Sequence, residues 1–199
     1  KIDVNESFEG GTLTIKFTQI NPNTPGQKDK RPQVIPIRTG FLTADGSEAT
    51  PERLLTLTSA EQSFKINGLS ARPTVSYLRN FSAPVILYRK VDNATRAFLF
   101  VNDNDLFNKW EEGRNYATSL LQDMATTGTG ADPTFTAAMQ TVAANNTLDP
   151  AFRALILALP SEEAIAQAMF NEGKTPEPDA IYSARAALNK AIATEMADD

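Results

Sequence analysis

Acidic and amide side chains gather at Asn102 to Asp105, which reads Asn-Asp-Asn-Asp, and two glutamates follow at Glu111 and Glu112. Oxygen-bearing side chains of this kind ligate calcium and other hard cations. Two carboxylates that lie close together can also act as a general acid and a general base. A third interpretation is structural, because aspartate and asparagine are preferred where a helix begins. The spacing of the residues decides among the three.

The calcium interpretation requires oxygen ligands at fixed positions of an EF-hand loop. A loop starting at Asp103 has Asp105 at its third position but Phe107 at its fifth. Its sixth position, which needs a glycine, is Asn108, and its twelfth, which needs a glutamate, is Arg114. We therefore expect Asp103 or Asp105 to cap a helix, an interaction that stabilises a helix by about 1 kcal/mol.

The other candidates for chemistry also fail on spacing. Adjacent helix residues point in different directions, so neither Glu111–Glu112 nor Glu162–Glu163 forms a catalytic pair. The stretch TTGTGADP at 126–133 lacks a preceding strand and a Gly-Lys-Ser/Thr sequence. It is predicted to connect two helices and not to bind phosphate. The sequence thus predicts no catalytic, cofactor-binding or metal-binding residue.

The composition of the 199 residues limits the sites that the chain could form. The absence of histidine removes Ser-His-Asp chemistry and imidazole metal ligands, and the absence of cysteine removes disulfides and thiolate sites. The net charge of −5 and the lack of a dense basic patch argue against a nucleic-acid partner. No apolar stretch is long enough to span a membrane, so we expect no membrane partner.

The N-terminal part of the chain has the residue pattern of β-strands. Leu13, Ile15 and Phe17 alternate with polar residues, which is the period of a strand buried on one face. Turn sequences such as Ala-Asp-Gly-Ser at 44–47 separate further short apolar runs. Such strands, with no helical period among them, predict an immunoglobulin-like β-sandwich. The expected strands are residues 12–20, 34–42, 54–58, 63–67, 74–81, 85–91 and 95–102.

The pattern changes to that of helices after residue 102. Apolar residues then recur with the helical period, and the number of alanines rises from 7 in residues 1–102 to 20 in residues 103–199. The net charge changes from +4 to −9 between the same two ranges. Four later helices are predicted to begin at Asp132, Asp149, Ser161 and Asp179. We therefore expect an all-β sandwich in residues 1–102 and an all-α array of five helices in residues 103–199.

Three parts of the sequence resemble one enzyme family. They are RLLTLTSAEQSFKINGL followed by SARPTVSYLRNFSAPVILYRK at 53–90, the segment with Asn104, Asp105, Phe107 and Trp110, and DPAFRALILALPSEEAIAQ at 149–167. Over nearly its whole length the chain resembles bacterial aminopeptidase N, a zinc metallo-aminopeptidase of the gluzincin class. Residues 1–102 resemble the β-sandwich domain of that family, and residues 103–199 resemble the start of its C-terminal helical domain.

The resemblance implies a non-catalytic role for this chain. In the family a separate domain holds zinc through a His-Glu-x-x-His helix and a distant glutamate, and the motif is absent here. We expect the parent enzyme to be a cytoplasmic hydrolase that uses zinc to remove N-terminal residues from peptides. This chain would have no cofactor and would be inactive alone. Its partners would be the catalytic domain and the remaining helices of the parent chain.

The chain would then be a structural spacer that positions the helical domain against the catalytic domain. The expected interdomain joint consists of Asp103, Asp105, Phe107 and Trp110, with both aromatic rings packed on a last strand at 95–102. The last helix, expected to run to Asp199 with an unfinished apolar stripe, and the start at Lys1 favour a piece of a longer protein. The alternative is an independent β-sandwich binding module with a helical extension, which would need an exposed apolar patch.

Overall fold

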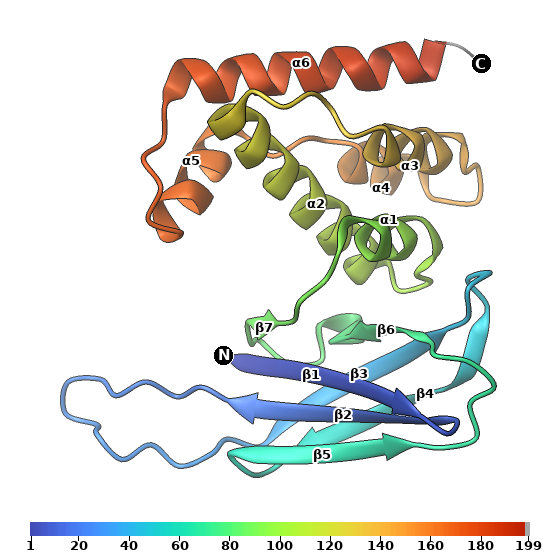
Figure 1. Cartoon of the computed structure of the whole chain (residues 1–199), viewed down its shortest axis with the longest axis vertical. Helices are drawn as coiled ribbons and strands as arrows, with labels where there is room; N and C mark the ends of the chain where they lie inside the picture. The colour runs from blue at the N-terminus through green and yellow to red at the C-terminus, as the bar shows by residue number, and fades with distance from the viewer. Residues whose placement is uncertain (198–199) are drawn as a thin grey trace. The chain divides into compact units, whose positions relative to one another are not determined.

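The computed structural model describes residues 1–197 and contains two β-sheets in its N-terminal part (Figure 1). Their strands are β1 (Ile2–Glu9), β2 (Thr12–Gln19), β3 (Ile35–Leu42), β4 (Glu48–Leu57), β5 (Glu61–Ile66), β6 (Thr74–Tyr77) and β7 (Leu87–Tyr88). One sheet has the strand order β5-β2-β1-β7, and the other has the order β4-β3-β6. Neighbouring strands are antiparallel except β1 and β7, which are parallel.

Alternating apolar residues place a hydrophobic core between these two sheets. Leu13, Ile15 and Phe17 of β2 are fully buried, as the period of two predicts. Ile37 of β3 and Leu57 of β4, from the other sheet, are equally buried and belong to the same hydrophobic cluster. Two sheets that share one core through their inner faces form a β-sandwich. The sequence-based prediction of this architecture is confirmed.

Strand β1 lies outside the strands expected from the sequence. Its sequence, IDVNESFE, contains aspartate, asparagine and glutamate, which are depleted in strands. It nevertheless pairs with β2 along its whole length, from Ile2 opposite Gln19 to Glu9 opposite Thr12. The turn Gly10–Gly11, in which both residues have positive φ, connects the two strands. The neighbouring strands therefore stabilise a strand that local propensity does not favour.

Six α-helices, one more than the five expected, follow within the described residues and form the predicted all-α array (Figure 1). They are α1 (Asn93–Asn102), α2 (Leu106–Thr127), α3 (Pro133–Ala144), α4 (Pro150–Ile156), α5 (Glu162–Asn171) and α6 (Pro178–Ala197). Helix α3 packs on α1 and α6, and α5 packs on α6. The expected end of the last helix at Asp199 lies outside the described residues. Within residues 1–197, no helix is long and apolar enough to cross a membrane.

Side-chain caps begin three of these helices where the sequence predicts them. The carboxylate of Asp132 accepts a hydrogen bond from the Thr134 N–H and caps α3. Asp149 caps α4 and Ser161 caps α5 in the same way. Asp179 does not occupy the expected position, because α6 begins one residue earlier and Asp179 lies inside its first turn.

Residues 95–102, expected as the last strand of the sandwich, are instead part of helix α1. The stretch is rich in phenylalanine and other residues that favour strands. In the structure the Asp92 carboxylate accepts a hydrogen bond of 2.8 Å from the Thr95 N–H and so supports the first turn of the helix. Ala97 and Phe100, three residues apart, are both buried in the core of the helical array. Tertiary burial therefore overrides the local preference for a strand.

Aromatic rings form the centre of the helical array. Phe100 of α1 stacks on Phe135 of α3 with ring centres 6.4 Å apart. Tyr116 of α2 meets Phe135 edge-on at 5.0 Å. Gly113 of α2 lies directly against Phe100, because a Cβ atom added there would be 2.5 Å from two ring carbons. The absence of a side chain at Gly113 therefore permits α1 and α2 to approach each other.

The chain passes between two compact units more than once. Residues 1–91 and 103–108 form one unit, called the sandwich unit below, and residues 92–102 and the chain from Lys109 form the helical unit. Segment 103–108 follows helix α1, which belongs to the helical unit. The segment itself belongs to the sandwich unit, and it contains the first residues of α2. This segment contains most of the cluster that the sequence singles out.

We expect the substitution Gly113→Ala to destabilise the protein, although alanine favours a helix over glycine by about 1 kcal/mol. The added methyl group would overlap the Phe100 ring, and forcing the ring aside costs about 1–3 kcal/mol. Urea unfolding followed by circular dichroism measures the change. Gly130→Ala is the control, because an added Cβ at Gly130 meets no atom within 4 Å. A Gly113→Ala variant more stable than wild type would contradict the packing described for α1 and α2.

Candidate functional site

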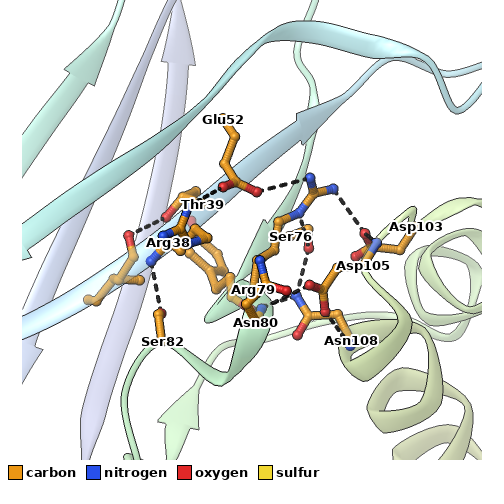
Figure 2. A network of polar contacts seen from close by, with 12 residues as sticks. Arg38, Thr39, Glu52, Ser76, Arg79, Asn80, Ser82, Asp103, Asp105 and Asn108 are labelled. Carbon is orange, nitrogen blue, oxygen red and sulfur yellow. Dashed lines mark hydrogen bonds and ion pairs between the residues drawn. The ribbon is translucent and has the colours of Figure 1, made fainter.

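A buried arginine, Arg79, is the centre of a polar network in the sandwich unit (Figure 2). It belongs to η1 (Arg79–Phe81), a short turn after β6, and its side chain is 3% exposed. Its Nε donates to Ser76 Oγ at 3.0 Å, and one terminal nitrogen donates to Asp103 Oδ1 at 2.9 Å. The other terminal nitrogen lies 3.5 Å from Glu52 Oε2. The buried positive charge is thus matched by carboxylates, as a charge removed from water requires.

Glycine in the middle of β3 makes room for this arginine. A Cβ atom added to Gly40 would lie 2.0 Å from Cζ of Arg79, so no other residue fits beside the guanidinium group. Glu52 shares its two oxygens between two arginines, because Oε1 accepts a hydrogen bond of 2.9 Å from Arg38. The Arg38 N–H in turn donates to Ser82 Oγ at 3.0 Å. Strands β3 and β4 and the turn after β6 therefore meet in one network.

Asp103 is the most buried carboxylate of the network, with 1% of the residue exposed. Its Oδ1 accepts from Arg79 and also from the Asp105 N–H at 3.0 Å. The Ser76 hydroxyl accepts from Arg79 and from the Asn108 side chain, and Oδ2 of Asp103 is buried without a hydrogen-bond partner among the described residues. Burial raises the pKa of Asp103 above its ordinary value of 3.8. The Ser76 hydroxyl, the Asp105 N–H and the Arg79 charge oppose this rise in pKa without cancelling it.

Asp105 and Asn108 attach the start of helix α2 to the sandwich. Oδ1 of Asp105 accepts a hydrogen bond of 2.9 Å from the Asn108 N–H, so Asp105 is the one of the two predicted candidates that caps this turn. Its Oδ2 accepts from the Asn80 N–H at 2.8 Å. The Asn108 side chain donates to Ser76 Oγ and to the carbonyl of Tyr77, both at 2.7 Å. The first turn of α2 is therefore bonded to β6 and to the turn that follows it (Figure 2).

The turn after β6 has a strained backbone that segment 103–108 holds in place. Leu78, Asn80 and Phe81 have φ angles of 58°, 53° and 49°, which residues other than glycine rarely adopt. Such conformations cost about 1–3 kcal/mol each and persist only where the surroundings impose them. The Phe81 ring meets Phe107 edge-on with ring centres 5.2 Å apart. This ring contact and the hydrogen bond from the Asn80 N–H to Asp105 both hold the strained turn in its conformation.

Three of the four residues predicted for the interdomain joint lie together in the sandwich unit: Asp103, Asp105 and Phe107. The fourth, Trp110, belongs to the helical unit, where it packs against the hydrophobic core and under the Arg114 guanidinium, 5.5 Å from the ring centre. The expected packing of aromatic rings on a strand at 95–102 is wrong, because that stretch is helical. The role of these four residues as a joint stays a prediction.

Sequence reasoning did not identify Arg79, Ser76 or Asn108. A single arginine near the end of a strand is mostly exposed in proteins, and its neighbours in the sequence do not show which partner it finds. One signal was available in Gly40, because glycine inside a strand often marks the close approach of another group. That signal indicates crowding at β3, but it does not name the arginine that causes it.

The network has the chemistry of a structural ion pair. Arg79 and Asp103 are nearly inaccessible to solvent, so neither can reach a substrate. Within residues 1–197, no group of three or more histidine, cysteine, aspartate or glutamate side chains is placed to hold a metal ion. Charges inside a protein attract each other more strongly than charges in water. The arrangement therefore ties segment 103–108 to the sandwich.

We expect Arg79→Met to lower the free energy of unfolding by about 3–5 kcal/mol, because it leaves Asp103 buried without its cation. The double variant Arg79→Met/Asp103→Leu should recover part of this loss, since both charges are then absent. Arg38→Met is the matched control. Its side chain is 44% exposed and pairs with the same Glu52, so its loss should stay below about 1 kcal/mol. Equal losses for Arg79→Met and Arg38→Met in urea unfolding would contradict the central role of Arg79.

The cost of ionising the buried Asp103 should lower the stability of the folded chain as pH rises. Because burial raises its pKa above 3.8, the folded chain keeps this proton at pH values where the unfolded chain has lost it. This cost in folding free energy is absent below the ordinary pKa, where Asp103 is protonated in both states, and it is complete once the pH has risen through the raised pKa. Asp103→Asn cannot titrate, so wild type should lose stability relative to this variant as pH increases through that window. Urea unfolding at several pH values measures the difference in unfolding free energy between wild type and Asp103→Asn. A wild type that gains stability relative to this variant as pH rises would show that the pKa of Asp103 is lowered and not raised.

Two sequence families and several known proteins match this chain. Residues 1–90 match the family described as domain of unknown function DUF3458, Ig-like fold, and residues 93–199 match DUF3458_C, ARM repeats. Aminopeptidase N of Caulobacter vibrioides is 37% identical over 164 residues, which is 80% of this chain and 18% of the relative. Aminopeptidase N of Escherichia coli is 32% identical over 211 residues, which is 100% of this chain and 24% of the relative.

The chain therefore spans a quarter or less of the length of these curated relatives. A crystal structure of Legionella pneumophila aminopeptidase A in complex with aspartic acid has the same fold, with a TM-score of 0.82 at 24% identity. That match covers 99% of this chain and 22% of the Legionella chain. The chain belongs to the family described as DUF3458, Ig-like fold, and DUF3458_C, ARM repeats, and it is homologous over its length to part of aminopeptidase N.

Proposed function

We propose that this chain is a non-catalytic part of a zinc-dependent aminopeptidase N, in which the sandwich unit is a structural spacer. The observation that carries the proposal is the similarity to curated aminopeptidases N along the chain, which spans only 18% and 24% of them. The parent enzyme would remove N-terminal residues from peptides in the cytoplasm. Its catalytic domain and its remaining helices would be the partners of this chain.

The zinc of the parent enzyme would be held by residues outside this chain. Zinc sites in proteins use histidine, cysteine and carboxylate ligands. The sequence has no histidine and no cysteine, and the described residues contain no cluster of three or more possible ligands. The residues present do not fit a zinc site, so no step of peptide hydrolysis is assigned to them.

Segment 103–108 supports the spacer role. A spacer can position one domain against another only if its connections resist bending. Here the connection between α1 and α2 runs through the sandwich unit, where Asp103 pairs with the buried Arg79 and Asp105 caps α2. A segment with buried, hydrogen-bonded side chains opens less readily than an exposed loop. We therefore assign the interdomain joint to Asp103, Asp105, Phe107 and Trp110.

The test compares this chain with the full-length protein that contains it. We expect full-length protein to release the chromophore from aminoacyl-4-nitroanilides in a zinc-dependent manner, and the 199-residue chain to give no release above a metal-free blank. In the full-length protein, Asp105→Ala should lower kcat/KM by at least about threefold through misplacement of domains, while the zinc content stays unchanged.

Asp29→Ala is the matched control for this experiment, because Asp29 lies in an exposed loop between β2 and β3. Its kcat/KM should equal that of the wild type. A full-length protein without zinc-dependent activity would refute the proposed enzyme class. An active protein in which Asp105→Ala behaves like Asp29→Ala would refute the spacer role alone.

A further inference from the structure

The dipeptide Asn67–Gly68 follows directly after β5 and is the only Asn-Gly pair in the 199 residues. Both residues are exposed. Among residues 1–197, no group forms a hydrogen bond with the Asn67 side chain, so its amide carbon is open to attack. The neighbouring residues Ile66 and Leu69 are buried, which anchors the pair on both sides.

The backbone nitrogen of Gly68 is also unprotected. Within the described chain, no acceptor takes a hydrogen bond from the Gly68 N–H, whereas the next amide, Leu69 N–H, donates to Gly11 O at 3.0 Å. Glycine has no Cβ to obstruct the approach of this nitrogen to the Asn67 side chain. The space around it is also open, because a Cβ added at Gly68 would meet no atom within 4 Å.

The pair Asp45–Gly46 shows how the same fold protects a comparable dipeptide. The Gly46 N–H donates to Thr43 O at 3.0 Å, so its nitrogen is engaged. Hydrogen bonds from Thr43 and Ser47 lower the pKa of Asp45 to about 2, which keeps the carboxyl group ionised and a poor electrophile. In the part of the chain that the structure describes, neither form of protection is present at Asn67–Gly68.

We propose that Asn67–Gly68 is a site of spontaneous deamidation, with water as the only co-reactant. The Gly68 nitrogen loses its proton and attacks Cγ of Asn67, a C–N bond forms, and the side-chain amide leaves as ammonia. The five-membered succinimide then takes up water, which breaks one of its two C–N bonds. One product has aspartate at position 67, and the other has isoaspartate, in which the main chain runs through the former side chain.

The isoaspartate product would disturb the end of β5. It adds a methylene group to the main chain between residue 67 and Gly68, one residue before Leu69, which is only 7% exposed. A Cβ atom added at Gly11 would lie 2.9 Å from the Leu69 carbonyl oxygen, so the turn between β1 and β2 is close to this backbone. Lengthening the chain here would displace the Leu69 side chain from the core or break its bond to Gly11. The modified protein should therefore be less stable than the original.

The experiment ages the purified chain at neutral and mildly alkaline pH and compares three samples: wild type, Asn67→Gln, and a synthetic peptide of residues 62–72. Peptide mapping by mass spectrometry locates the amide loss, and an isoaspartyl carboxyl methyltransferase with labelled methyl donor counts isoaspartate. We expect Asn67 in the folded chain to deamidate at a rate within about threefold of its rate in the peptide, because the folded segment is not protected. Asn67→Gln should acquire almost no label, because a glutamine side chain would have to close a larger ring.

The other asparagines of the wild-type chain are internal controls. Asn80 is exposed like Asn67, but phenylalanine follows it, so its amide should persist. Aged wild type should unfold at a lower urea concentration than aged Asn67→Gln. A folded chain that deamidates at Asn67 at least ten times more slowly than the peptide would overturn the proposal. Label that appears equally in wild type and Asn67→Gln would also overturn it.

Discussion

The polar network of the sandwich unit depends on the need to pair one buried charge. Arg79 is 3% exposed, and a guanidinium group removed from water is tolerated only with carboxylate and hydrogen-bond partners around it. Asp103 supplies the closest of these carboxylates from a segment 24 residues further along the chain. Gly40 supplies the space, and Ser76 links the arginine to Asn108. The glycine in β3, the serine in β6, the turn that contains Arg79 and the segment that contains Asp103 all meet around this ion pair.

The same pairing explains why a strained turn persists and why helix α2 starts where it does. Positive φ angles at Leu78, Asn80 and Phe81 are unfavourable by themselves, so other contacts must hold them. Segment 103–108 provides these contacts, and Asp105 serves both the Asn80 backbone and the first turn of α2. Segment 103–108 therefore both holds the strained turn and begins helix α2. The proposed spacer role rests on these contacts and on the similarity to aminopeptidase N.

Local sequence patterns predicted the parts of the fold that depend on local physics. The alternation in β2 and the caps at Asp132, Asp149 and Ser161 were correct, because a strand period and a capping side chain act within a few residues. Strand β1 was missed and α1 was assigned as a strand, because each is stabilised by distant partners against its own propensity. In the site, the sequence indicates that Asp103 or Asp105 is a helix cap, but it does not indicate the roles of Arg79, Ser76 and Asn108, since nothing near them in the sequence indicates burial.

By itself the sequence determined the order of a β-sandwich and a helical array, the absence of histidine and cysteine ligands, and the resemblance to aminopeptidase N. Composition and short-range periodicity carry all of this information. Only the tertiary structure decided that Asp103 faces Arg79, that Trp110 packs in the helical unit while Phe107 packs on Phe81, and that Gly68 lacks the protection given to Gly46. The physical reason is that burial and pairing depend on which distant segments meet, and a residue's neighbours along the chain do not specify that.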